Sequence, residues 1–279
     1  MTNPSSTSRV GVCSWSLQAS NPTQLVQRVR ATGCDAVQLH LDPLRTSQWS
    51  TEDTTAALRD ANIAILSGMM TTEGEDYTTL ESIARTGGVR PDETWPANLE
   101  IAKADADLAQ ALGIKLVTFH AGFLPHDPAD PERTKLLERL RTVADIFHAA
   151  GVRLGLETGQ ETAATLTAAL DELDHPGVGV NFDPANMILY AMGDPTHALN
   201  TLAPRVIQVH IKDATPTATP GTWGAEVPAG EGTVDWQGFF AVLAERLPNL
   251  DLLIEREAGD NRVEDIATAR ALIERYRSA

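Results

Sequence analysis

The sequence contains little cysteine, little basic charge and no long apolar run, and each shortage excludes a class of protein. Two cysteines among 279 residues, Cys13 and Cys34, cannot form a disulfide framework, so we expect buried free thiols. The balance of 22 basic against 38 acidic residues gives a net charge of −16, which argues against binding to nucleic acid or to an anionic membrane. No apolar run is long enough to cross a bilayer. Residues 1–9 lack the apolar core of a signal peptide, so we expect a cytoplasmic protein whose partner is a small molecule.

What the sequence does contain is an alternation of short apolar runs with amphipathic segments. Eight β-branched runs are predicted to be strands, at residues 10–15, 35–40, 63–69, 115–120, 153–158, 178–183, 206–213 and 251–255. Apolar residues at helical spacing and capping signals predict eight helical segments, at residues 21–32, 51–61, 99–112, 130–150, 161–173, 196–202, 235–246 and 263–276. This count closes an α/β barrel of the (β/α)8, or TIM barrel, type, which commonly takes about 250 residues. We therefore predict a single domain over residues 1–279. An open doubly wound sheet is the alternative, disfavoured because the first strand lacks a glycine-rich phosphate-binding turn.

Four reactive side chains lie where consecutive predicted strands end. Glu157, Asp183, His210 and Glu255 each end or follow an apolar run, and the carboxyl ends of parallel strands meet at one face of a barrel. The first two steps between them are 26 and 27 residues, which matches the roughly 25–30 residues of one β/α unit. Two Glu, one Asp and one His form an oxygen-rich set that suits Mn²⁺, Mg²⁺ or Co²⁺. The alternative is that each carboxylate merely ends its strand and caps the next helix, as Asp183 could before Pro184.

Ordered motifs around these residues carry a resemblance to a known family. They are Leu156-Glu157-Thr158, Phe182-Asp183-Pro184-Ala185-Asn186, His210-Ile211-Lys212-Asp213, Gly230-Glu231-Gly232 before Val234-Asp235-Trp236, and Ile254-Glu255. Over nearly its whole length the chain resembles the xylose isomerase-like TIM barrel superfamily, which holds sugar phosphate isomerases and epimerases, ketose 3-epimerases, inosose dehydratases and the family 2 AP endonucleases. The resemblance implies that the four residues bind one divalent metal ion, with Mn²⁺ favoured. In the epimerases the residues matching Glu157 and Glu255 are also the acid and the base.

Three functions remain open at this point. The first is a metal-dependent isomerase or epimerase of a sugar or keto-sugar, in which a Glu takes a proton from the carbon next to a carbonyl. The second is a lyase or dehydratase with the same metal site, acting on a keto-sugar, a keto-inositol or an oxidised glycoside. The third is a non-catalytic sugar-binding protein, which would not need two opposed carboxylates. The chain has Asn186 where ketose 3-epimerases and the endonucleases carry a histidine, and Pro216 where the epimerases carry an arginine. A trinuclear zinc site is therefore not expected.

Further polar and aromatic residues are candidates to contact the sugar. They are Trp15, His40, His120, Asn186 and Lys212. Purely structural roles stay open. Trp15 could simply pack against its neighbours, the histidines could form hydrogen bonds at the barrel rim, and Lys212 could form an ion pair with Asp213. Two long loops, residues 70–93 and 214–234, are expected to close over the substrate. Scattered Arg and Lys at the strand exits favour a neutral sugar over a sugar phosphate. A homo-oligomer is compatible with the sequence.

Overall fold

The structure, a computed structural model, describes residues 8–277. Predictions that concern residues 1–7, including most of the segment judged to lack a signal peptide, lie outside the described residues, as do residues 278 and 279. None of the described helices combines the length and the apolar character that crossing a membrane requires.

Eight parallel strands close into a barrel in the order β1-β10-β7-β6-β5-β4-β3-β2. The strands are β1 (Val10–Cys13), β2 (Ala36–His40), β3 (Ala64–Met69), β4 (Leu116–Phe119), β5 (Arg153–Glu157), β6 (Val178–Phe182), β7 (Val206–Ile211) and β10 (Leu252–Ile254). Each predicted run contains one of them, and the predicted (β/α)8 barrel is confirmed.

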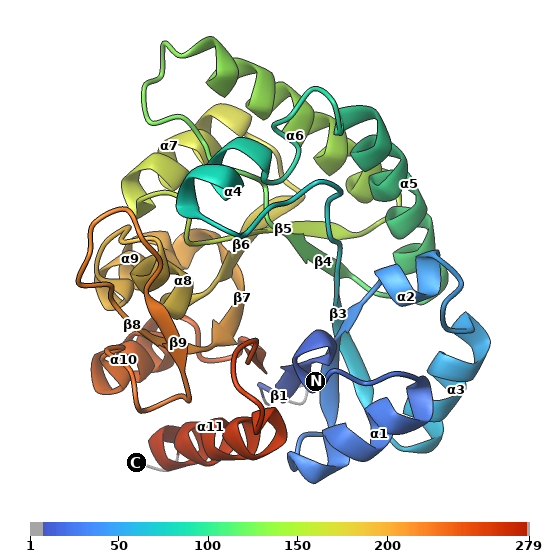
Figure 1. Cartoon of the computed structure of the whole chain (residues 1–279). Coiled ribbons are helices and arrows are strands. Elements are labelled where there is room, and N and C mark those ends of the chain that lie inside the picture. The colour runs from blue at the N-terminus through green and yellow to red at the C-terminus, as the bar shows by residue number, and fades with distance from the viewer. Residues whose placement is uncertain (1–7, 278–279) are drawn as a thin grey trace, which may run out of the picture.

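Helices form a ring around the strands (Figure 1). Those that match the predicted segments are α1 (Pro22–Ala31), α3 (Thr51–Asp60), α5 (Trp95–Ala111), α6 (Pro131–Ala149), α7 (Ala163–Leu173), α9 (Pro195–Leu202), α10 (Trp236–Arg246) and α11 (Arg262–Arg277). The last helix contacts the first, which completes the ring. Two predicted helix starts differ from the structure by more than one residue. The helix α5 begins at Trp95 rather than at Leu99. The helix α7 begins at Ala163 rather than at Glu161, because the Thr162 side chain caps it by accepting from the Thr165 backbone amide.

Several short helices, turns and strands lie in the connections between the main elements, and the sequence did not predict them. They are α2 (Asp42–Arg45), α4 (Leu80–Thr86), α8 (Pro184–Leu189), the 3-10 turns η1 (Ser14–Leu17) and η2 (Ala203–Arg205), and an antiparallel pair, β8 (Asp213–Thr215) with β9 (Ala225–Val227). Each is too short for a hydrophobic period to be recognised in the sequence. The predicted loop 70–93 contains α4, and the predicted loop 214–234 contains most of the β8–β9 pair.

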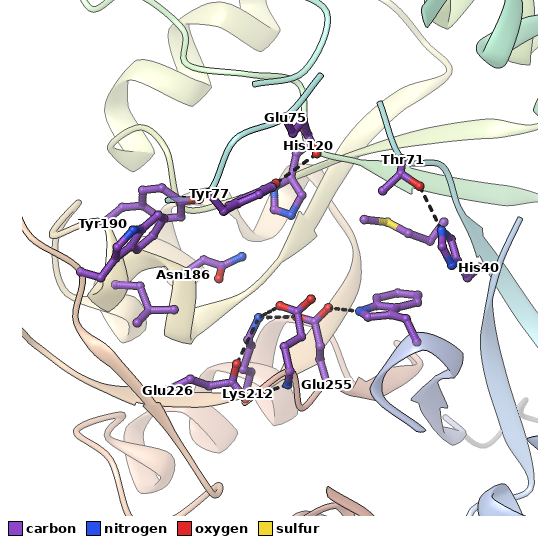
Figure 2. Close-up of a pocket in the computed structure, with 15 residues that line it drawn as sticks. His40, Thr71, Glu75, Tyr77, His120, Asn186, Tyr190, Lys212, Glu226 and Glu255 are labelled. Atoms are coloured by element: carbon purple, nitrogen blue, oxygen red, sulfur yellow. Dashed lines mark hydrogen bonds and ion pairs between the residues drawn. The ribbon is translucent and has the colours of Figure 1, made fainter. Parts of the chain in front are cut away.

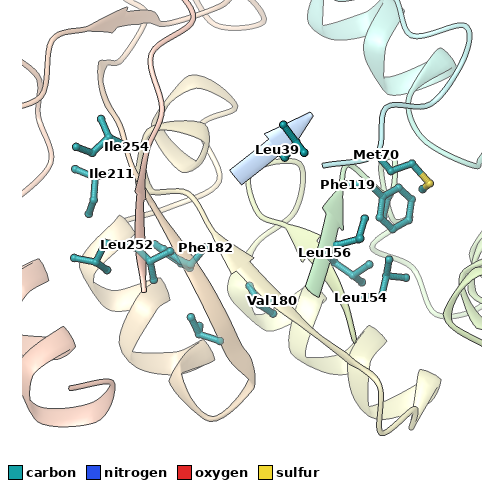
Figure 3. Close-up of a cluster of buried hydrophobic side chains, with 14 of the residues drawn as sticks. Leu39, Met70, Phe119, Leu154, Leu156, Val180, Phe182, Ile211, Leu252 and Ile254 are labelled. Atoms are coloured by element: carbon teal, nitrogen blue, oxygen red, sulfur yellow. The ribbon is translucent and has the colours of Figure 1, made fainter. Parts of the chain in front are cut away.

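The barrel has an apolar layer outside and a polar interior. Buried side chains such as Leu39, Phe119 and Phe182 belong to a continuous apolar core, part of which is drawn in Figure 3. Gln38 on β2, in contrast, donates to Thr118 Oγ1 on β4 at 2.7 Å and lies 2.8 Å from His210 Nε2 on β7. These three strands are not neighbours in the barrel order, so the bonds cross the interior. On β2, β4 and β7, alternation along the strand thus sends apolar residues toward the helices and these polar side chains inward.

Candidate metal centre and active site

The four predicted ligands meet at the carboxyl end of the barrel. Glu157 ends β5, Asp183 and Glu255 directly follow β6 and β10, and His210 lies in β7. Their ligand atoms all lie within 4.8 Å of one another. His210 Nδ1 is 3.4 Å from an oxygen of Glu157, 3.6 Å from Asp183 Oδ2 and 3.4 Å from an oxygen of Glu255. All four residues are buried.

Two atoms at the centre of this group have no hydrogen-bond partner among the described residues. They are His210 Nδ1 and Asp183 Oδ2. The other nitrogen of the imidazole, Nε2, lies 2.8 Å from the amide oxygen of Gln38 and 3.1 Å from the side-chain nitrogen of Asn181. The Gln38 oxygen can only accept and is the closer partner, which favours a proton on Nε2. In the neutral ring Nδ1 then offers its lone pair to the centre, as a metal-binding histidine does. The donor set therefore fits a divalent ion that prefers oxygen ligands.

The negative charges of Glu157 and Glu255 would also attract a cation to this centre. Burial acts to raise the pKa of Glu157 and of Glu255, but His120 and His210 outweigh it at Glu157, and Lys212 and His210 outweigh it at Glu255. Both pKa values therefore lie below the ordinary value, and both groups are carboxylates at neutral pH. Burial lowers the pKa of His210, yet its negative neighbours raise it well above the ordinary value. A proton would thus compete with a metal ion for this centre.

A second layer of buried side chains holds the candidate ligands in place, and the sequence did not predict it. Gln38 orients His210, and Asn181 donates to Glu157 Oε2 at 3.3 Å. The only signal in the sequence was a polar residue inside an otherwise apolar strand. The two oxygens of Asp183 face different partners. Its Oδ1 accepts from the backbone N–H of Asn186 and so caps α8, while its Oδ2 faces His210 Nδ1 at the centre. Both interpretations of Asp183 offered by the sequence are compatible with this geometry.

A cavity of about 400 Å³ is lined by Glu255, one of the four candidate ligands, and by the other residues drawn in Figure 2. The five residues predicted to contact the sugar all line it, namely Trp15, His40, His120, Asn186 and Lys212. Trp15, His120, Asn186 and Lys212 also contact the candidate ligands. The Trp15 indole donates to Glu255 Oε1 at 2.8 Å, the Asn186 amide donates to Glu157 Oε1 at 3.1 Å, and His120 Nε2 lies 3.7 Å from that same oxygen.

Lys212 is surrounded by carboxylates. Its ammonium lies 2.8 Å from Glu255 and 2.7 Å from Glu257, with Asp183 and Glu226 at 3.9 Å. The considered pairing with Asp213 is therefore wrong.

Asp213 instead accepts from the backbone amides of Gly230, Gly232 and Val234 and from the Trp236 indole. A Cβ on Gly232 would lie 2.1 Å from the Asp213 carboxylate. Only glycine therefore lets the backbone at residue 232 come this close to Asp213. The Gly-Glu-Gly motif thus anchors the loop to Asp213.

The two long loops contribute cavity residues that the sequence analysis did not identify. Glu75 and Tyr77 come from the first loop, and Glu226 from the second. Glu257, which follows β10, and Tyr190, which follows α8, also line the cavity. Their positions depend on how the loops fold over the barrel, which no local pattern in the sequence reports.

Comparisons with known proteins agree with this architecture. A solved xylose isomerase domain protein from Planctomyces limnophilus is 30% identical, with 91% of this chain and 92% of that chain covered and a TM-score of 0.85. A xylose isomerase-like TIM barrel protein from Mycobacterium smegmatis in complex with magnesium shares the fold at 19% identity, with 99% of each chain covered and a TM-score of 0.74. An L-ribulose 3-epimerase also shares it at 19% identity, with 97% and 96% covered and a TM-score of 0.72.

Among curated proteins, the 3-oxo-isoapionate decarboxylase of Pectobacterium atrosepticum (strain SCRI 1043) is 26% identical over 152 residues, which are 53% of this chain and 54% of that protein. The chain spans about half the length of the curated relatives it matches. The sequence profile described as a xylose isomerase-like TIM barrel matches residues 26–278, and the chain belongs to this family.

Proposed function

We propose that this protein is a divalent-metal-dependent isomerase or epimerase of a free sugar or keto-sugar, acting by proton transfer at a carbon next to the carbonyl. The observation that carries the proposal is the buried centre, in which three carboxylates converge on an unpartnered imidazole nitrogen next to a cavity that Glu255 lines. Glu157, Asp183, His210 and Glu255 would hold the ion. Mn²⁺ is the first choice and Mg²⁺ or Co²⁺ are alternatives, and the magnesium complex of a family member supports a divalent cation. A cytoplasmic location is part of the proposal, supported by two buried free cysteines.

The two glutamates supply the proton transfer. A bound divalent ion would act as a Lewis acid that makes the C–H next to the carbonyl more acidic. One of Glu157 and Glu255 takes that proton, and the other returns a proton from the opposite face of the carbon. They lie at the ends of separate strands, β5 and β10. In each turnover the glutamate that accepts is the carboxylate and the one that donates is the carboxylic acid, and exchange of both protons with solvent restores the starting forms. Asn186 orients Glu157, and Trp15 and Lys212 orient Glu255, through the hydrogen bonds that they donate.

The lining of the cavity supports an uncharged substrate. Glu75, Glu226 and Glu257 lie around it, and the ammonium of Lys212 is already paired with Glu255 and Glu257. A phosphate or a carboxylate on the substrate would meet this negative field without a free cationic partner among the described cavity residues. A neutral ketose avoids that repulsion.

A second candidate is the loss of CO2 from a keto acid at the same centre. The similarity to a 3-oxo-isoapionate decarboxylase favours it. The acidic cavity argues against it, because such a substrate carries a carboxylate. The isomerase or epimerase is therefore the preferred function.

Exchange with heavy water distinguishes the candidates. The protein loaded with Mn²⁺ is incubated with free ketoses in D2O, and NMR is expected to show deuterium at one carbon next to the carbonyl with every carbon of the sugar retained. Turnover without deuterium at any carbon would exclude proton abstraction. Release of CO2 from a sugar-derived keto acid would instead favour the second candidate, and a strong preference for a ketose phosphate would refute the neutral substrate.

A further inference from the structure

His40 lies in the active-site cavity but apart from the metal centre. It ends β2 and lines the cavity together with Trp15 (Figure 2). The Trp15 ring contacts both histidines, with its centroid 6.2 Å from that of His40 and 6.2 Å from that of His210. The Trp15 indole thus contacts both His40 and a candidate ligand. His40 itself does not belong to the group of candidate metal ligands, so it is available to a part of the substrate that is not held there.

A chain of hydrogen bonds fixes the orientation of the His40 ring. His40 Nε2 lies 2.9 Å from Thr71 Oγ1, and the Thr71 hydroxyl donates to Asp42 Oδ2 at 2.7 Å. Arg45 then binds Asp42 at 2.8 Å and the buried Asp105 at 3.2 Å. The chain ties the cavity wall to α5 through a series of side chains that are half-buried or buried.

The direction of these bonds determines which nitrogen of His40 carries the proton. Burial acts to raise the pKa of Asp42, but hydrogen bonds from His40, Thr71 and Arg45 outweigh it and hold that pKa well below the ordinary value. Asp42 is therefore a carboxylate and can only accept. Because the single hydroxyl proton of Thr71 goes to Asp42, Thr71 must accept from His40, and Nε2 carries the proton.

The other nitrogen of the neutral ring, Nδ1, is then a hydrogen-bond acceptor. No described residue donates to it, and the His40 side chain is 27% exposed. We propose that His40 is a specificity-determining residue whose Nδ1 accepts a hydrogen bond from a sugar hydroxyl remote from the oxygens held at the metal centre. This inference rests on the proposed function and names the substrate class more closely: a polyhydroxy ketose with a hydroxyl at the end that lies against β2. A site built to bind a hydroxyl rejects the analogue that lacks it.

The test uses sugars that differ by one terminal hydroxyl. The probes are D-fructose, D-tagatose, D-allulose and D-sorbose, with their 6-deoxy counterparts, which lack the terminal hydroxyl far from the carbonyl. The wild type is compared with His40→Phe and Thr71→Val, all loaded with Mn²⁺. Thr72→Val is the matched control, because its buried hydroxyl has no hydrogen-bond partner among the described residues. Metal content and deuterium exchange are measured beside kcat and KM.

The wild type is expected to prefer one parent ketose over its 6-deoxy counterpart by roughly tenfold or more in kcat/KM. His40→Phe should abolish that preference, mainly through KM, while metal content stays unchanged. Thr71→Val should weaken the preference, and Thr72→Val should keep it. A His40→Phe variant that still discriminates, or a wild type that turns over parent and deoxy sugars alike, would overturn the inference. If His40→Phe does not fold, undiminished discrimination in Thr71→Val overturns it. Wild type that exchanges no ketose at all would instead mark the failure of the proposed function, and the inference would fall with it.

Discussion

Replacing Gln38 with leucine tests whether the polar interior of the barrel tunes the metal centre. Gln38 is fully buried, and its amide oxygen is 2.8 Å from His210 Nε2. Leucine removes the acceptor that fixes the ring with Nδ1 toward the other ligands. Loss of such an outer partner typically costs about 10–100-fold in metal affinity, which corresponds to about 1.4–2.8 kcal/mol. We therefore expect the dissociation constant for Mn²⁺ to rise by that factor in calorimetric titration.

The control is Gln208→Leu, since Gln208 is equally buried and donates to Asn181 but contacts none of the four candidate ligands. It should change the affinity much less. Circular dichroism and thermal unfolding must show that both variants fold, because each leaves buried polar groups unpaired at about 1–3 kcal/mol. A folded Gln38→Leu protein with wild-type affinity would refute the idea that Gln38 positions His210.

Three further outcomes are expected. Glu255→Gln should retain part of the metal but lose about 10²–10⁴-fold in kcat, because an amide cannot act as a carboxylate base; near-wild-type kcat would contradict its role in proton transfer. Burial raises the pKa of Glu161 from 4.5 to about 8, and His120 offsets only part of this effect. Ionisation of Glu161 therefore lowers the free energy of unfolding. The loss is absent below pH 4.5, grows as the pH rises to about 8, and reaches about 5 kcal/mol above that pH. Glu161→Gln should thus resist urea better than the wild type at about pH 9 but not at about pH 5, and an equal difference at both would contradict the shift. Limited proteolysis should cut within residues 70–93 and 214–234 more slowly when metal and ketose are present, and equal rates would argue against closing loops.

The strands and the candidate ligands were the predictable part of this protein. A barrel repeats one β/α unit, so the steps between Glu157, Asp183 and His210 reported in advance which side chains share the carboxyl end of the barrel. Asp183 could be interpreted from sequence as a cap or as a ligand, and only its two oxygens in three dimensions show that it can be both.

The rest depended on contacts between elements distant in the sequence. Gln38 has no local signal for its role, because its partners lie on β4 and β7, across the barrel interior. The bond from Thr71 to Asp42 joins the segment after β3 to the start of α2, 29 residues away in the sequence. The Gly-Glu-Gly motif was visible, but its function as a cradle for Asp213 requires the fold that brings residue 213 beside residue 232.

The most direct test of the central claim is a crystal structure of the protein with Mn²⁺ and a free ketose, with anomalous scattering recorded to locate the metal. We predict a single strong peak per chain, within about 2.0–2.6 Å of side-chain atoms of Glu157, Asp183, His210 and Glu255, with sugar oxygens beside it and the reacting carbon between the two glutamates. A peak elsewhere, or a sugar bound in the cavity with no metal at these four residues, would contradict the account.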